Sequence, residues 1–140
     1  MSNSSIGWTV IRLTLAVLIA AHGWMRLLGG GVVPFGEWLG TQGMPFGLAI
    51  AAAITAVEIL GTPLFALGYV VAPLAAVYAG IYSAGIAMVH AREGWFVVGA
   101  GRNGAEYSVL LIVCLLAVGL QHWRPAAARA PDTLSRRPGA

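Results

Sequence analysis

The first apolar run of the chain, residues 6–28, is long enough to cross a bilayer, yet it carries Arg12, His22 and Arg26. At about 100° per residue, these three side chains fall within an arc of roughly 80° on one face of a helix. Charges that deep in lipid are costly, so this face should turn toward a bundle interior or a wet cavity. The run predicts a membrane protein whose other helices supply partners for one polar face.

The composition agrees with this class. Of the 140 residues, 59% are hydrophobic and 9% are charged, whereas soluble domains usually carry about 25% charged residues. Eight arginines and five acidic residues give a net charge of +3. Because this positive charge lies in the spans or in the basic tail, we expect the anionic membrane surface, and not nucleic acid, to be its partner.

The sequence holds no covalent redox centre. Its single cysteine, Cys114, permits no internal disulfide, and no CxxC, haem-attachment or iron–sulfur spacing is present. Three histidines leave too few ligands for a metal site. Residues 1–5 carry no positive charge and the following run contains Arg12, so we expect this run to be a retained helix and not a signal peptide.

Four apolar runs predict an all-α fold, a bundle of four transmembrane helices over residues 1–123. The runs are residues 6–28, 46–67, 69–89 and 105–122, each close to the ~20 residues that cross the hydrocarbon. Residues 29–45 are rich in glycine, proline and tryptophan and look too broken for a helix of that length. Residues 124–140 read as a basic, disordered tail.

An even number of spans puts both termini on one side of the membrane. Four arginines follow residue 123, against Arg92 and Arg102 in the loop on the opposite side. This excess predicts that both termini are cytoplasmic, in a bacterial-type inner (plasma) membrane.

Two charged groups in the spans have opposite signs and similar expected depths. Counting the helical rise, Arg12 lies ~9 Å and Glu58 roughly 14 Å from the cytoplasmic end of their helices. We therefore predict an intramembrane Arg12–Glu58 ion pair, which would cancel two costly charges. On the alternative interpretation, such a pair serves only to fix the register of the helices.

A second polar layer is expected near the opposite surface. His22 and Arg26 are one turn apart, His90 closes the third run, and Glu106 and Tyr107 open the fourth. A histidine beside a carboxylate can exchange protons near neutral pH, which favours a binding site. Tyr78 and Tyr82 are predicted to line its cavity or to pack. The alternative is that the charged groups snorkel into the headgroups.

This ordered set of residues resembles the DoxX family of small four-helix membrane proteins. The matching features run through about residues 8–122: Arg12, His22-Gly23-Trp24-Met25-Arg26, Phe35-Gly36-Glu37-Trp38-Leu39, Gly43-Met44-Pro45, Glu58-Ile59-Leu60-Gly61, His90 and Glu106-Tyr107. Arg26 stands where the family often has lysine, and Thr62-Pro63 replaces a more glycine-rich continuation.

The resemblance implies association with membrane redox systems, in particular with quinone-linked oxidoreductases such as thiosulfate:quinone oxidoreductase. The first hypothesis is an accessory subunit, with electrons supplied by a partner, in which the outer layer contacts a non-covalently bound quinone or its protons. The residues assigned to these contacts are His22, Arg26, His90, Glu106 and Tyr107, with Tyr78 and Tyr82 against the ring.

Two other hypotheses stay open. The chain could be a structural or assembly subunit of a membrane complex or homo-oligomer, with no ligand chemistry. It could also form a small-solute or proton pathway, which four short helices would support only if several copies assembled.

Overall fold

The computed structural model describes residues 3–98 and 102–123, and in these residues the fold is helical with no strand. The elements in chain order are α1 (Asn3–Leu28), α2 (Val32–Thr41), α3 (Gly47–Leu67), α4 (Val71–Gly85), a π-helix (Ile86–His90), α5 (Ala91–Glu93) and α6 (Glu106–Gln121). The all-α class is confirmed for this part of the chain. The predicted tail, residues 124–140, lies outside the described residues.

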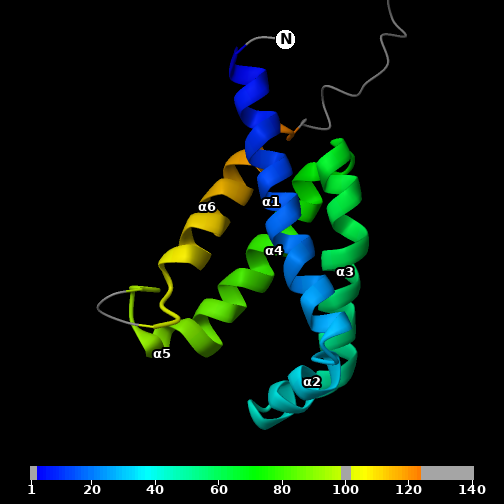
Figure 1. Ribbon diagram of the computed structural model, residues 1–140, viewed down its shortest axis with the longest axis vertical. Coiled ribbons are helices and arrows are strands. Elements are labelled where there is room, and N and C mark those ends of the chain that lie inside the picture. Colours follow the sequence, from blue (N-terminus) through cyan, green and yellow to red (C-terminus); the bar gives the residue numbers. More distant parts are fainter. Residues whose placement is uncertain (1–2, 99–101, 124–140) are drawn as a thin grey trace, which may run out of the picture.

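The helices form two pairs. α1 lies along α3, and α4 lies along α6 (Figure 1). α3 and α4 meet at a tight turn through Gly68, which has a φ of +88°, a left-handed conformation that suits glycine. From this turn the two pairs diverge, and the short helix α2 packs against α3 at the far end (Figure 1). The divergence separates the pairs at the end where α2 lies.

Three segments are long and apolar enough to cross a membrane by length and composition: Ser4–Leu28, Gly47–Leu67 and Val71–Glu93. α6 is also apolar but has 16 residues, fewer than the ~20 of an ordinary span. The fourth span therefore stays a prediction. The third segment runs to Glu93 and not to residue 89, because the π-helix and α5 continue α4 without a break.

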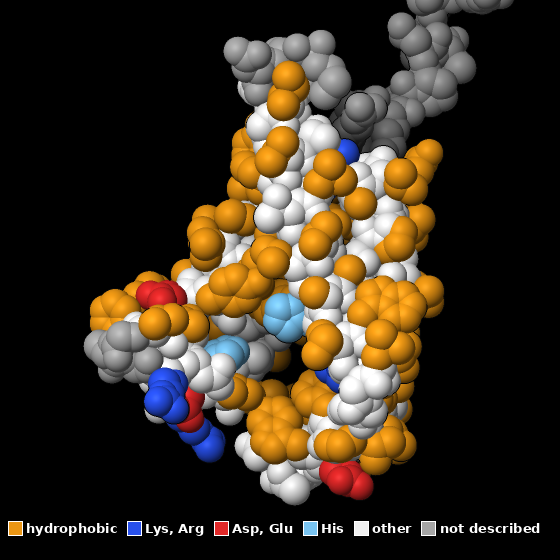
Figure 2. Space-filling model, in the orientation of Figure 1, with side chains coloured by type: hydrophobic (Ala, Val, Ile, Leu, Met, Phe, Trp, Pro, Cys, Tyr) orange, Lys and Arg blue, Asp and Glu red, His pale blue; other side chains and the backbone are white. Residues whose placement is uncertain are grey.

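The core lies between the two helix pairs. Its completely buried side chains are Ile19, Phe65, Tyr78, Leu115 and Val118. Large apolar side chains also cover the outside of the helices, as with Val17, Leu60 and Leu120, which are 69%, 70% and 75% exposed. Hydrophobic groups spread over the visible face in Figure 2. Such a surface suits a helix bundle whose outer face meets lipid.

Residues 29–45 do not form one long helix, but they hold a short helix that was not predicted, α2 at Val32–Thr41. Pro34 lies in its first turn, where a missing N–H leaves no intrahelical bond unmade. Gly36 is buried against α3, and a Cβ there would come within 2.6 Å of the Leu48 Cα. The glycine that argued against a helix instead lets α2 lie directly on α3.

Candidate functional site

A single ion pair joins α1 to α3 in the part of the chain that the structure describes. Arg26 Nη1 donates to Glu58 Oε2 at 2.6 Å and to Thr55 Oγ1 at 3.1 Å. Thr55 in turn donates to the Ala51 carbonyl at 2.8 Å. The Glu58 side chain is 2% exposed and that of Arg26 19%. Both charges are therefore compensated where their desolvation would otherwise be most costly.

The predicted Arg12–Glu58 pair is wrong, because the two residues lie at different depths. Gly23 of α1 lies against Glu58, since a Cβ at Gly23 would be 2.9 Å from the Glu58 Cβ. Arg12 is 11 positions earlier, about 16 Å along the helix. Arg26 is one turn beyond Gly23, and helical side chains lean toward the N-terminus. Arg26 therefore reaches back to Glu58.

Arg12 contacts α6 instead. Its Nη1 lies 2.8 Å from His122 Nε2, and His122 Nδ1 lies 3.0 Å from the Val118 carbonyl. Because a carbonyl only accepts, Nδ1 carries the proton and Nε2 accepts from the arginine. This contact lies at the end of the bundle away from α2, and no pattern in the sequence indicates that His122 takes part in it.

A cavity of 630 Å³ opens where the helix pairs diverge. Most of its wall is aliphatic, and its aromatic and polar lining residues are His22, Arg26, Phe35, Trp38, Glu58, Tyr82, His90, Asn103, Tyr107 and Ser108. Figure 2 shows the hollow on one face, with histidine side chains beside it. A largely apolar pocket with a few convergent polar groups is typical of a small-molecule site.

The structure brings together four of the five residues predicted for the outer layer: His22, Arg26, His90 and Tyr107 all line the cavity. Glu106 does not line it. Its Oε1 accepts from the Val97 backbone N–H at 3.0 Å, so it holds the loop before α6. His90 is held by a backbone oxygen and not by this carboxylate, because His90 Nδ1 lies 2.6 Å from the Asn103 carbonyl.

The two cavity histidines have the same hydrogen-bonding arrangement. His22 Nδ1 lies 2.8 Å from the Leu18 carbonyl, as His90 Nδ1 lies beside that of Asn103. Each Nδ1 therefore donates a proton to a backbone oxygen, and each neutral ring keeps its lone pair on Nε2. Both rings can accept a hydrogen bond or a proton from a ligand through Nε2.

The two tyrosines of α4 differ. Tyr78 is fully buried, donates to the Val57 carbonyl at 3.0 Å and packs edge-on against Phe65, so of its two predicted roles it packs in the core and does not line the cavity. Tyr82 does line the cavity, in edge-to-face contact with His22 at 6.1 Å between ring centroids. Its hydroxyl is buried and has no hydrogen-bond partner among the described residues. Such an unpaired buried donor is rare and calls for an explanation.

The π-helix places His90 on the cavity side of its segment. Tyr82 and residue 89 are seven positions apart, so they would share a face of an unbroken α-helix. The π turn (Ile86–His90) holds one extra residue, which rotates the positions after it by about 100° relative to an unbroken α-helix. His90, and not residue 89, therefore lies roughly on the face that carries Tyr82. π-turns are frequent at functional sites, but no pattern in this sequence identifies one.

Phe35 and Trp38 of α2 were not predicted as site residues. Their rings stack with centroids 6.1 Å apart and an interplanar angle of 16°, and both line the cavity. The Arg26 guanidinium lies 4.9 Å from the centroid of Phe35, within cation–π range. Their spacing of three residues would have put them on one face, had residues 29–45 been recognised as helical.

The apolar helices and the cavity between them define a small helical membrane protein. The family model for DoxX matches residues 7–91, more than half of the chain. The chain belongs to the DoxX family, as its motifs indicated. The match covers α1 through the π-helix, with the ion pair and most of the cavity wall, and ends before α6. Comparisons with curated proteins and with solved structures gave no match.

Proposed function

We propose that this protein is an accessory subunit of a quinone-linked oxidoreductase system and that its cavity holds the quinone headgroup. The observation that carries the proposal is the cavity itself, an apolar space of 630 Å³ with aromatic walls and convergent polar groups. The size lies within the range of ordinary small-molecule pockets. A bound quinone would supply two-electron, two-proton redox chemistry, with electrons exchanged through a partner subunit.

The residues of the cavity fit such a group. A quinone headgroup is a flat ring with oxygens on opposite edges, so it needs aromatic walls and hydrogen-bonding groups at two places. Phe35 and Trp38 form a stacked wall, and the unpaired Tyr82 hydroxyl is a donor that lacks an acceptor among the described residues. An oxygen of the ligand would complete this hydrogen bond.

His22 and His90 have complementary roles in this proposal. With Nδ1 held by a backbone carbonyl, each ring keeps its orientation and offers Nε2. In the neutral form Nε2 accepts from a hydroxyl of the reduced ligand, and in the protonated form it donates to a carbonyl of the oxidised ligand. The two histidines can therefore take up or release the protons that accompany electron transfer.

Arg26 and Glu58 shape the site without being free to transfer protons. The Glu58 carboxylate is held by Arg26 at 2.6 Å, and Arg26 is also held by Thr55 and Phe35. The pair adds no net charge to an apolar cavity, so it supplies a fixed local dipole at low electrostatic cost. We propose that it orients a ligand oxygen and keeps α1 attached to α3.

We further propose that α6 is the fourth span and that both termini are cytoplasmic in the inner (plasma) membrane. α6 buries Leu111, Leu115 and Val118 against the rest of the bundle while exposing Leu110, Val113 and Leu120, which is the pattern of a helix between protein and lipid. Its 16 residues cover about 24 Å, and flanking residues or local thinning of the bilayer accommodate the difference.

The same ion pair also supports a second candidate, a structural subunit whose polar groups serve packing and partner docking. The discriminating experiment is purification of the full-length protein in mild detergent, with mass spectrometry of co-purifying proteins and of extracted lipids. A redox protein together with stoichiometric quinone supports the cavity proposal. A partner that co-purifies without quinone, and whose association is lost in His22→Ala, supports the structural candidate.

A further inference from the structure

Arg12 lacks a carboxylate partner in the described residues, unlike Arg26 on the same helix. Arg26 is neutralised by Glu58. Arg12 contacts His122 Nε2, and its own Nε is buried with no hydrogen-bond partner in the part of the chain that the structure describes. An arginine side chain stays protonated in proteins. A half-buried cation of this kind requires an anion to offset its desolvation.

The described neighbours of Arg12 leave several of its N–H donors without an acceptor. His122 accepts one hydrogen bond and brings no negative charge, because its Nδ1 proton is donated to Val118. Gly68 lies on another side, where a Cβ would be 3.3 Å from Arg12 Nη1. A guanidinium has five N–H donors, so donors on Nη1 and Nη2 remain after His122 is satisfied.

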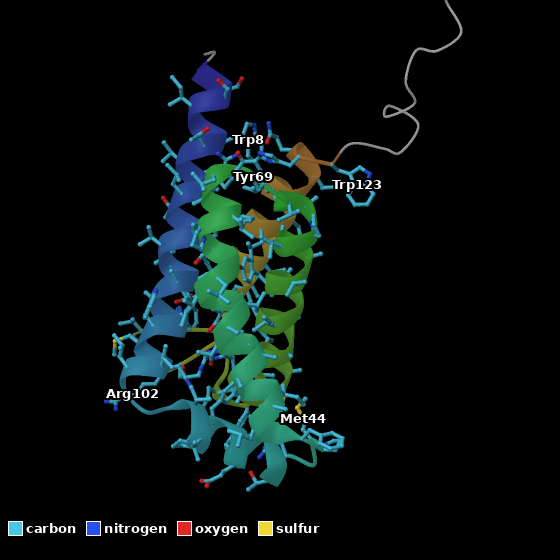
Figure 3. All side chains as sticks on the ribbon, turned by 90° about the vertical axis from the view of Figure 1, so that its right-hand side faces the viewer. Trp8, Met44, Tyr69, Arg102 and Trp123 are labelled. Carbon is cyan, nitrogen blue, oxygen red and sulfur yellow. The ribbon has the colours of Figure 1, made fainter. Side chains whose placement is uncertain are left out.

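The position of Arg12 along the bundle indicates which kind of anion would be found at its depth. Trp8, Tyr69 and Trp123 lie at the same end of the molecule, away from Met44 and Arg102 at the other end (Figure 3). Trp8 precedes Arg12 by one turn, Tyr69 follows Gly68, and Trp123 follows His122. Tryptophan and tyrosine gather at the headgroup level of a bilayer, which is also the level of the lipid phosphates.

We propose that Arg12 binds the phosphate of an anionic phospholipid headgroup at this end of the bundle. The planar guanidinium fork matches two phosphate oxygens, and such charge-assisted hydrogen bonds are strong where water is partly excluded. The site is 14 residues from Arg26 on α1, about 21 Å from the cavity end. It therefore does not depend on the proposed quinone function.

The test uses the full-length protein in mild detergent, titrated with phosphatidylglycerol and followed by native mass spectrometry. The wild type binds one phosphatidylglycerol with high affinity. Arg12→Gln removes the charge and the fork, so this affinity falls at least about 10-fold. Arg92→Gln is the matched control, because Arg92 is exposed in α5, near the opposite end of the molecule, and its loss leaves the affinity unchanged. Equal affinities for the wild type and Arg12→Gln overturn the proposal.

Two further arms separate the lipid from other anions. Inorganic phosphate at millimolar concentration leaves the bound lipid in place, and displacement of the lipid assigns the site to a free anion instead. Asp132 lies outside the described residues, so Asp132→Asn in the full chain tests it as the partner of Arg12. Unchanged lipid affinity supports the proposal, and a rise of about 10-fold shows that Asp132 competes for Arg12 and overturns it.

A conservative variant keeps the proposal testable if Arg12→Gln does not fold. Arg12→Lys keeps the positive charge but loses the planar fork. The proposal predicts a folded protein in which phosphatidylglycerol binds more weakly than to the wild type. A folded Arg12→Lys protein with the lipid affinity of the wild type would contradict recognition by the guanidinium fork.

Discussion

Gly23 of α1 lies against the backbone and Cβ of Glu58 on α3, so that a Cβ at Gly23 would be 2.9 Å from that of Glu58. This approach lets the two helices lie close together at the depth where the one carboxylate of α3 is buried. It also sets the register in which Arg26, and not Arg12, reaches Glu58. The Arg26–Glu58 pair thus depends on a residue with no side chain.

Gly23→Ala should destabilise the protein by roughly 1–3 kcal/mol, because the new methyl group overlaps atoms that cannot move away cheaply. Thermal unfolding in detergent measures the loss. Gly7→Ala on the same helix is the control, since no atom of the described residues lies within 4 Å of a Cβ at that position. An equal effect of both substitutions would mean that α1 and α3 are not in this register.

Arg26→Met and Glu58→Met should each cost ~3–5 kcal/mol, because each leaves one charge unpaired at low dielectric. The double variant should cost much less than the sum. Unfolding midpoints of the single and double variants give the coupling energy. The same cycle with Arg12→Met and Glu58→Met is the control and should be additive, since these side chains lie far apart along α1 and α3. A coupling energy in the second cycle would show that Arg12 and Glu58 interact after all.

Tyr82→Phe and Tyr78→Phe should have opposite consequences. Tyr78→Phe loses the hydrogen bond to Val57 and should lower stability by about 1 kcal/mol. Tyr82→Phe removes a hydroxyl that has no partner among the described residues, so stability should be unchanged or higher, while binding of a quinone analogue should weaken. A loss of stability in Tyr82→Phe would show that its hydroxyl is already satisfied in the absence of ligand.

The proposed topology can be tested by cysteine labelling in intact cells, with the natural Cys114 replaced by serine. Gly40→Cys and Val98→Cys should react with an impermeant reagent, and Ser135→Cys should react only after the cells are opened. Gly40 and Val98 are both exposed. Labelling of Ser135→Cys from outside would reverse the orientation and place the Arg12 end in the outer leaflet.

The sequence was sufficient for the class of protein and for five of the ten aromatic and polar residues that line the cavity. Long apolar runs fix helices, and the cost of a bare charge in lipid predicts that Arg26 and Glu58 face inward. Which charges pair was not predictable from their counted depths. The pairing depends on where the turns between helices lie. Gly68, at the end of α3, is beside Arg12, so Glu58, ten residues before Gly68, lies about 15 Å deeper in the bundle than Arg12.

The rest of the site depends on local geometry that residue patterns do not reveal. α2 was missed because Pro34 and Gly36 were interpreted as breakers, whereas one lies in the first turn and the other in a close helix contact. Glu106 looked like a partner for His90 from charge alone, but backbone groups of the loop satisfy both residues first. The π-turn that helps orient His90 has no signature here.

Binding of a quinone-type ligand by the cavity histidines can be measured as the affinity of a quinone analogue for three histidine variants of the purified protein. His22→Ala and His90→Ala each remove a cavity Nε2, and binding to each should be about 5- to 150-fold weaker than to the wild type. His122→Ala removes a histidine at the opposite end of the bundle and should leave the affinity unchanged. Equal affinities in all three variants and the wild type would contradict binding by the cavity histidines.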